Sequence, residues 1–282
     1  MTKHILLMDG PDSKGLVYHV TSVLFNNECN ILRQDEYVSP KGQFFMRTEF
    51  ETEAEEAEID AKKVLGDLRT AIPNEEINFR LNPKKKKDVV ILCTKEHHCL
   101  SDLLIRYHFE EINANILAVV SNYNTLQPFV SKFGIPFHYI SHEHKTREEH
   151  EEAILKTLEI YNPEYIVLAK YMRILTADFV KHFPNRIVNI HHSFLPAFIG
   201  ANPYRQAYER GVKIIGATAH FVNNNLDEGP IIAQDVKNVN HRHTARAMSR
   251  EGKDVEKTVL TKALKLVFND RVFVYGNRTV IL

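Results

Sequence analysis

Short apolar runs rich in β-branched residues recur along the chain after residue 88, and stretches with helical periodicity separate them. Runs that are apolar at consecutive positions, instead of at alternating ones, are typical of strands buried on both faces. Strands of this kind that alternate with helices predict a doubly wound, mostly parallel α/β sheet with helices on both sides. The runs read VVILCTK, ILAVVSN, FHYIS, YIVLAK and RIVNIH and occupy residues 89–95, 116–122, 137–141, 165–170 and 186–191.

The first 82 residues follow a different pattern and predict a separate small domain. Two strand-like runs joined by Pro40, Lys41 and Gly42 indicate a hairpin, and an amphipathic stretch after them is typical of a helix. The resulting order βαββαβ is that of the ferredoxin-like split motif. The predicted strands are 4–9, 31–39, 43–51 and 77–81, the predicted helices are 16–24 and 55–72, and the lysine-rich residues 83–87 predict a linker to a second domain at 88–282.

Charge and composition exclude some classes of function. Lys and Arg together number 36, and so do Asp and Glu, so no net charge draws the chain to nucleic acid or to an anionic membrane. No apolar stretch approaches the roughly 20 residues of a membrane span, and the N-terminal apolar run is too short for a signal peptide. The three cysteines, Cys29, Cys93 and Cys99, form no disulfide-like pattern, so we expect a cytoplasmic protein.

Polar side chains follow three of the predicted strands. Arg173 follows the fourth run, Asn189 and His191 end the fifth, and Asp227 lies in a turn after a later strand-like stretch. In open α/β sheets, ligands bind beyond the carboxyl ends of the strands. We therefore expect these side chains to converge on one cleft.

The residue types at these strand ends predict a reaction at a carbonyl group. Asn189 and His191 are two positions apart on an extended backbone, so they face the same side. An Asn amide donates to a developing oxyanion, and an imidazolium stabilises the same charge or passes a proton to a leaving group. Asp227 can hold the imidazole charged and receive a proton from water. Because no Ser or Cys nucleophile accompanies these groups, the pattern favours direct attack without a covalent intermediate.

Structural interpretations of the same residues remain open at this point. Asn189 can satisfy backbone groups of a loop, and Asp227 fits ordinary turn chemistry. His191 and His192 can equally be semi-buried histidines of the core. The joint occurrence of the polar residues at successive strand ends favours a functional site.

Fifteen histidines also raise the alternative of a metal site. Two His-x-His pairs supply only two ligands each, without an obvious third ligand nearby. A His-His-Cys run fits an ordinary helix N-terminus, so we expect no metal. These segments are His142 with His144, His241 with His243, and His97 to Cys99.

Several spaced motifs resemble a known family. NIHHSFLP at 189–196, GATAHFVNNNLDEGPIIAQ at 216–234 and AKYMRIL at 169–175 resemble the formyltransferase fold family, whose members handle 10-formyltetrahydrofolate. Residues 9–31 resemble an ACT domain, a small regulatory module. This combination is similar to the formyltetrahydrofolate deformylases. The resemblance implies a ferredoxin-like βαββαβ ACT domain at 1–82, a linker at 83–87 and a Rossmann-like formyltransferase domain at 88–282.

The resemblance also implies roles for particular residues. One departure is visible, because His192 stands where the transferases of the family commonly have Pro. By position, the catalytic residues are Asn189, His191 and Asp227, the folate-binding residues are Met172, Arg173, Leu175 and Asn224, supporting positions are Thr218 and His220, and an effector site involves Asp12, Gly15 and Asn30.

The acceptor of the formyl group decides between a hydrolase and a transferase. In the glycinamide ribonucleotide transferases of this family, a Gly-rich loop after the first strand holds a phosphate. Here that strand is followed by EHHCLSDLL, which has no Gly, and Glu96 and Asp102 would repel a phosphate. We therefore expect hydrolysis of 10-formyltetrahydrofolate to formate and tetrahydrofolate. Formyl transfer to an amine, and a regulator that binds folate or an amino acid without catalysis, remain alternatives.

The expected partners follow from the same resemblance. They are a small-molecule folate substrate, an amino-acid effector at the ACT-like domain, and further copies of the chain in a homo-oligomer. We expect no permanently bound cofactor. Pure assembly through an edge strand is the alternative role for the N-terminal domain.

Overall fold

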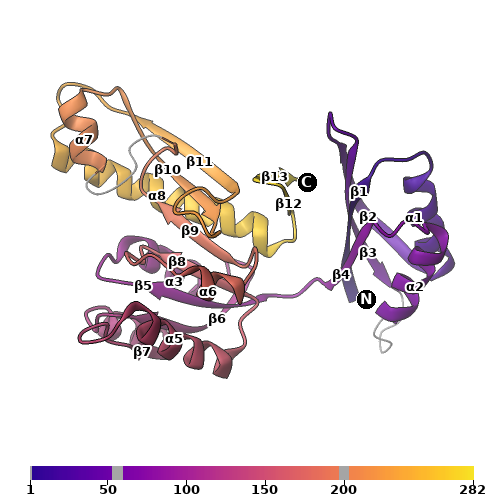
Figure 1. Ribbon diagram of the computed structural model, residues 1–282, viewed down its shortest axis with the longest axis horizontal. Helices are drawn as coiled ribbons and strands as arrows, with labels where there is room; N and C mark the ends of the chain where they lie inside the picture. Colours follow the sequence, from indigo (N-terminus) through magenta and orange to yellow (C-terminus); the bar gives the residue numbers. More distant parts are fainter. Residues whose placement is uncertain (1, 53–59, 197–202) are drawn as a thin grey trace. The chain divides into compact units, whose positions relative to one another are not determined.

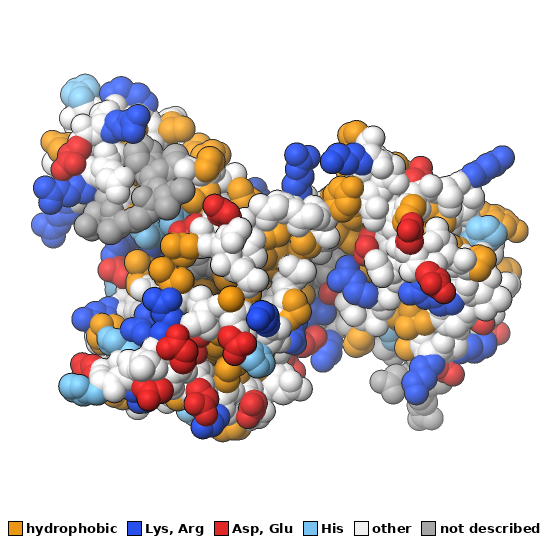
Figure 2. Space-filling model, viewed as in Figure 1, with side chains coloured by type: hydrophobic (Ala, Val, Ile, Leu, Met, Phe, Trp, Pro, Cys, Tyr) orange, Lys and Arg blue, Asp and Glu red, His pale blue; other side chains and the backbone are white. Residues whose placement is uncertain are grey.

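The computed structural model describes residues 2–52, 60–196 and 203–282. The chain forms two compact units (Figure 1). The N-terminal unit comprises Met1–Lys85, Asn269–Phe273 and Val280–Leu282, and the larger unit comprises Lys86–Phe268 and Val274–Thr279. Figure 2 shows acidic and basic side chains spread over the same face of the molecule, in agreement with their equal numbers.

The N-terminal unit has the predicted βαββαβ order, and its four strands form an antiparallel sheet in the order β2-β3-β1-β4. Apolar residues of α1 and α2 pack with those of β1 and β3 in one core. The start of the predicted helix 55–72 lies outside the described residues; α2 begins at Ala61, where the Asp60 side chain caps the helix by accepting from the Lys63 backbone N–H. The elements are β1 (Thr2–Pro11), α1 (Leu16–Asn26), β2 (Cys29–Val38), β3 (Gln43–Thr52), α2 (Ala61–Ala71) and β4 (Asn78–Pro83).

The larger unit is built on a seven-stranded sheet in the order β11-β10-β9-β8-β5-β6-β7. The pairs of the five strands β5 to β9 are parallel, which confirms the mostly parallel sheet. Consecutive core positions on β5, such as Val89, Val90 and Ile91, are buried, as expected for a strand covered on both faces. The strands are β5 (Lys87–Cys93), β6 (Ala114–Ser121), β7 (Phe137–Tyr139), β8 (Tyr165–Ala169), β9 (Ile187–His191), β10 (Ile214–Phe221) and β11 (Ile231–Asn238).

Helices cover this sheet, and the longest of them, α8, packs against β9, β10 and β11 and against α3 and α7. A short hairpin of β12 (Val272–Tyr275) and β13 (Arg278–Ile281) follows α8. No helix within the described ranges is long and apolar enough to cross a membrane. The helices are α3 (His98–His108), α4 (Gln127–Val130), η1 (Ser131–Phe133), α5 (Arg147–Tyr161), α6 (Ala177–Lys181), α7 (Pro203–Arg210) and α8 (Ala245–Phe268).

One strand runs against the expectation that the polar strand ends meet at a single edge of the sheet. β10 is antiparallel to β9, with Thr218 opposite His191 and Phe221 opposite Val188. The carboxyl end of β10 therefore lies beside the start of β9, away from His191. The loop between β10 and β11 returns over the face of the sheet, because its Asp227 contacts His191.

Candidate active site

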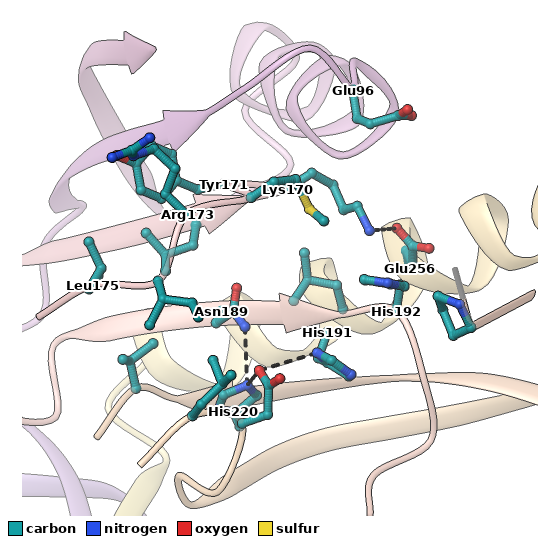
Figure 3. A pocket seen from close by; sticks show the side chains of 18 of the residues that line it. Glu96, Lys170, Tyr171, Arg173, Leu175, Asn189, His191, His192, His220 and Glu256 are labelled. Atoms are coloured by element: carbon teal, nitrogen blue, oxygen red, sulfur yellow. Dashed lines mark hydrogen bonds and ion pairs between the residues drawn. The ribbon is translucent and has the colours of Figure 1, made fainter. Parts of the chain in front are cut away.

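A cavity of about 770 Å³ opens over β9 and β10 and holds the predicted catalytic residues (Figure 3). One end is lined by residues of the loop after β8 and of the β10–β11 hairpin, and the other by polar and charged side chains that include Glu96, Tyr204 of α7 and Glu256 of α8. Asn189, His191 and His220 lie on adjacent strands between the two ends. The cavity therefore joins a mixed apolar and amide-rich compartment to an ionic one.

His191 and Asp227 form an ion pair, with 3.2 Å between the imidazole Nδ1 and the carboxylate Oδ1. The His191 Nε2 atom is buried and has no hydrogen-bond partner among the described residues. Burial would by itself raise the pKa of Asp227, but the hydrogen bond from His191 and the nearby imidazoles outweigh burial and hold that pKa below its usual value. The carboxylate is therefore ionised and fixes one side of the ring, which leaves the Nε2 side for a ligand.

The Asn189 amide is oriented by His220 on the neighbouring strand. His220 Nδ1 donates to the Phe221 backbone carbonyl at 2.9 Å, so its Nε2 accepts from the Asn189 Nδ2 at 3.1 Å. Burial lowers the pKa of His220, which favours the neutral ring that this arrangement needs. The second N–H of Asn189 stays available to a ligand in the cavity.

Thr218 holds the turn that follows His191. Its hydroxyl donates to the Ser193 carbonyl at 2.9 Å and accepts from the Leu195 backbone N–H at 3.0 Å and from Gln234 at 2.9 Å. The strand β10 thus supports the site twice, through the Thr218 hydroxyl and through the His220 ring.

Gly229 lets the hairpin that carries Asp227 pass close to β10. A Cβ atom at this position would lie 1.7 Å from the Phe221 carbonyl oxygen. Phe221 also pairs with this segment, because its N–H donates to the Pro230 carbonyl at 2.9 Å. A side chain at 229 would therefore push the hairpin off the strand.

We expect Gly229→Ala to lower the free energy of unfolding by at least about 2 kcal/mol and to lower catalytic activity with it. The matched control is Gly66→Ala in α2, where a Cβ atom meets nothing within 4 Å. At this helical position, Ala loses less conformational entropy on folding than Gly, so the free energy of unfolding should rise by up to about 1 kcal/mol. Thermal unfolding of both variants measures the difference, and equal unfolding temperatures would contradict the assigned close approach.

The predicted folate-binding residues all line the cavity on the side of the loop after β8 and of the β10–β11 hairpin. Met172 is 59 % exposed and Leu226 is 56 % exposed, so apolar surface there is available to a ligand. This wall offers apolar side chains and asparagine amides together, which suits a flat, partly polar ring. The residues are Met172, Arg173, Leu175 and Asn224.

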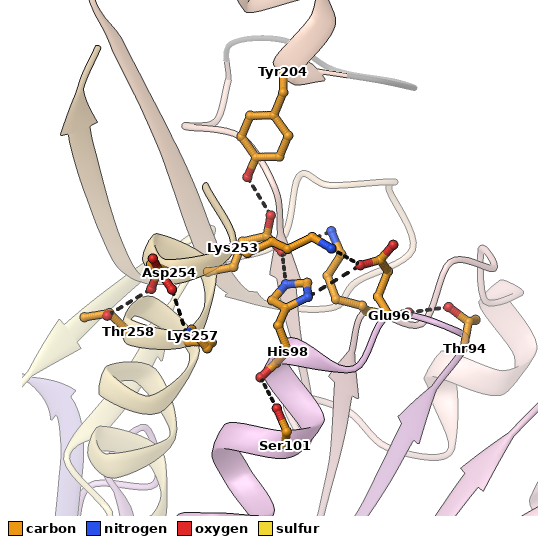
Figure 4. A network of polar contacts seen from close by, with 11 residues as sticks. Thr94, Glu96, His98, Ser101, Tyr204, Lys253, Asp254, Lys257 and Thr258 are labelled. Atoms are coloured by element: carbon orange, nitrogen blue, oxygen red, sulfur yellow. Dashed lines mark hydrogen bonds and ion pairs between the residues drawn. The ribbon is translucent and has the colours of Figure 1, made fainter. Parts of the chain in front are cut away.

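The ionic end of the cavity was not anticipated from the sequence. Glu256 of α8 is 1 % exposed and accepts from His98 at 2.7 Å and from the Tyr204 hydroxyl at 2.5 Å. The Lys170 ammonium lies 3.2 Å from the same carboxylate, and Lys253 binds Glu96 nearby (Figure 4). These contacts fix a buried, ionised carboxylate at the wall of the cavity.

The charge of Glu256 follows from its neighbours. Burial would raise its pKa, but the His98 hydrogen bond, the Lys170 ammonium and the Tyr204 hydroxyl together lower the pKa to about 2.

The signal for this cluster in the sequence is weak. Lys170 ends an apolar run, but its partners come from separate elements that no local pattern connects.

His98, Cys99 and Glu256 place potential metal-ligand atoms within 4.8 Å of one another. This group suits a cation poorly, because the Lys170 ammonium already contacts the carboxylate. Burial also raises the pKa of the Cys99 thiol, which disfavours the thiolate that binds metals. The chemistry of these donors therefore does not favour a metal.

The predicted effector residues do not form one cluster within the chain. Asp12 and Gly15 follow the end of β1, where β1 pairs with the start of β3. Asn30 pairs with Glu51 near the end of β3. At about 3.4 Å per residue, roughly 25 Å of strand separates the two places.

Comparison with known proteins identifies the class of this fold and site. The family model of formyl transferases matches residues 87–264, which include Asn189, His191 and Asp227. The formyltetrahydrofolate deformylases of Haemophilus influenzae and Escherichia coli are each 53 % identical to this chain; the first match covers 99 % of both chains, and the second covers 96 % of this chain and 95 % of the relative. The crystal structure of a deformylase from Pseudomonas syringae pv. tomato superposes with a TM-score of 0.94 at 36 % identity and covers 100 % of this chain and 95 % of the other. The chain belongs to the formyltetrahydrofolate deformylase family.

Proposed function

We propose that this protein hydrolyses 10-formyltetrahydrofolate to formate and tetrahydrofolate by direct attack of water on the formyl carbon. The observation that carries the proposal is the arrangement around His191. Its Nδ1 is held by Asp227, while its Nε2 is buried without a described partner, on the same strand as the Asn189 amide. Two such groups on one face suit a single carbonyl oxygen that becomes an oxyanion.

In the proposed mechanism, the formyl oxygen accepts hydrogen bonds from Asn189 and from His191. Water forms the new C–O bond while one of its protons passes to Asp227. The C–N bond then breaks, and the folate nitrogen takes a proton from His191, which Asp227 replaces. Formic acid leaves and ionises in solvent. A preorganised oxyanion donor contributes about 10²–10³ in rate, and a positioned proton-transfer group about 10²–10⁴.

The loop after β5 supports water as the acceptor, in preference to a phosphorylated amine. Residues 94–98 contain no Gly, and Glu96 and Glu256 place two carboxylates at this end of the cavity. Lys253 and Lys170 already pair with these carboxylates, at 2.6 Å and 3.2 Å. The two ammonium groups are thus already engaged by carboxylates and are not free to bind an anionic acceptor.

Incubation of the protein with 10-formyltetrahydrofolate, first alone and then with an amine, tests the proposed function. Formate should appear without any amine, and tetrahydrofolate should appear in equal amount. Product formed only when an amine is consumed would indicate a transferase. No product in either case would indicate a binding protein.

Replacing Asn189 with Ala should lower the kcat of formate release by about 10²–10³, because one oxyanion donor is lost. The control is Asn78→Ala, at an exposed position of the N-terminal unit, which should keep wild-type kcat. Steady-state formate assays compare the two variants. An Asn189→Ala enzyme with wild-type kcat would remove this amide from the mechanism.

We also propose that the N-terminal unit binds an amino-acid effector and that the chain forms a homo-oligomer in the cytoplasm. β2 lies at an edge of the N-terminal sheet, so its outer backbone groups can pair with another copy. The three cysteines are free thiols, which suits a reducing compartment. Calorimetric titration of the full chain with each amino acid tests the effector. If no amino acid gives a heat of binding, a role in assembly alone is favoured.

A further inference from the structure

His192 lies in the cavity at the junction of its two ends. Its ring stacks on that of His191, with 5.1 Å between centroids and 25° between planes. Figure 3 shows the His192 ring between His191 and Glu256. Within the described part of the chain, its ring nitrogens make no hydrogen bond to protein, although the ring lines the cavity. A polar side chain so placed is available to a small ligand beside the catalytic imidazole.

The surroundings of His192 keep its ring neutral. Burial first, and then the Lys170 ammonium, lowers the pKa of His192 to about 4. A neutral imidazole has one nitrogen with a free lone pair, which accepts a hydrogen bond but does not donate one. The charged and titratable groups that face it are Lys170 after β8, His191 on β9, Asp227 on the hairpin, Tyr204 on α7 and Glu256 on α8.

The wall beyond His192 is fixed in shape. The Tyr204 ring lies against Gly252 of α8, where a Cβ atom would be 2.1 Å from the Tyr204 hydroxyl. That hydroxyl donates to Glu256, one helical turn further along α8. The His192 and Tyr204 ring centroids are 6.4 Å apart. The cavity wall beside His192 is therefore formed by Tyr204 and Glu256, which are fixed by packing against Gly252 and by a hydrogen bond.

We propose that His192 is a further catalytic residue, which holds the attacking water by accepting a hydrogen bond from one of its O–H groups. This inference rests on the proposed hydrolysis. The second O–H of the same water points to Asp227, which takes its proton, and an oxygen lone pair is left to form the C–O bond. His192 itself gains no proton in this step. The role explains why a histidine, in place of an apolar residue, stands next to His191.

The test compares His192→Phe with the exposed His108→Phe on α3 as a control. Phe keeps a flat ring against His191 but removes both nitrogens. The kcat of formate release should fall by about 10- to 100-fold, the KM for 10-formyltetrahydrofolate should change less than threefold, and the control should match wild type. His192→Gln, whose amide oxygen also accepts a hydrogen bond, should recover part of the loss.

Chemical rescue separates water binding from a packing role. In His192→Ala, added imidazole should raise kcat at least threefold, whereas it should not change the kcat of His192→Phe, because the ring fills the space. A His192→Phe enzyme with more than half of wild-type kcat would overturn the inference, and so would the absence of any rescue in His192→Ala. Wild-type protein that releases no formate would instead refute the proposed function itself.

Discussion

Replacing His191 with Ala should lower the kcat of formate release by at least about 10³. In the proposed mechanism this side chain has two roles, since it donates a hydrogen bond to the formyl oxygen and supplies the proton for the leaving nitrogen. Each role alone is worth about 10² or more in rate. Single-turnover formate assays at saturating substrate measure the loss, and thermal unfolding of the variant shows that the fold is kept.

The exposed His108→Ala variant is the matched control for His191→Ala, because it removes an imidazole outside the cavity lining. It should keep wild-type kcat. A His191→Ala enzyme within tenfold of wild type would show that the chemistry proceeds without the imidazole. The ion pair with Asp227 would then be structural only.

Replacing Asp227 with Asn should lower kcat by about 10²–10⁴ at nearly constant volume, because the amide neither attracts the imidazolium nor accepts a proton. Asp227 has a φ of 57°, in the left-handed region, which Asn tolerates as well as Asp does. The variant should therefore fold normally. Because the pKa of Asp227 lies below its usual value, the wild-type carboxylate stays ionised in mild acid. Protonation of Asp227 should therefore not lower the kcat of the wild type between pH 7 and pH 5.

Asp254→Asn is the corresponding control, since Asp254 is exposed on α8 and pairs with Lys257 there. Its kcat should equal that of wild type at both pH values. An Asp227→Asn enzyme with kcat within threefold of wild type would exclude the carboxylate as proton acceptor.

The spacing of apolar residues in the sequence predicted most strands of the two sheets, because that spacing depends on which faces of a strand are buried. Consecutive apolar residues mark strands covered on both faces, and all five of these runs became strands of the parallel part. The direction of β10 could not be read in the same way. A strand buried on both faces has the same composition whether it pairs parallel or antiparallel, so its direction depends on the connections around it.

The two halves of the cavity differ in how far the sequence could predict them. Asn189 and His191 were accessible to prediction, because alternation along one strand places them together. Lys170, His98 and Glu256 come from three elements far apart in the chain, and a single acidic residue on α8 resembles any solvated helix position. Only tertiary packing brings Glu256 inside, where His98 and Lys170 compensate its burial.

The candidate catalytic residues are carried by two elements that differ in how firmly the sheet holds them. Asn189 and His191 belong to β9, an interior strand, whereas Asp227 is delivered by a loop next to β11, the last strand of its sheet. Fraying begins at such boundary strands and needs far less free energy than global unfolding. We therefore expect loss of activity and loss of the folded state to be separable events, because local opening of β11 would displace Asp227 while Asn189 and His191 stay in register on β9.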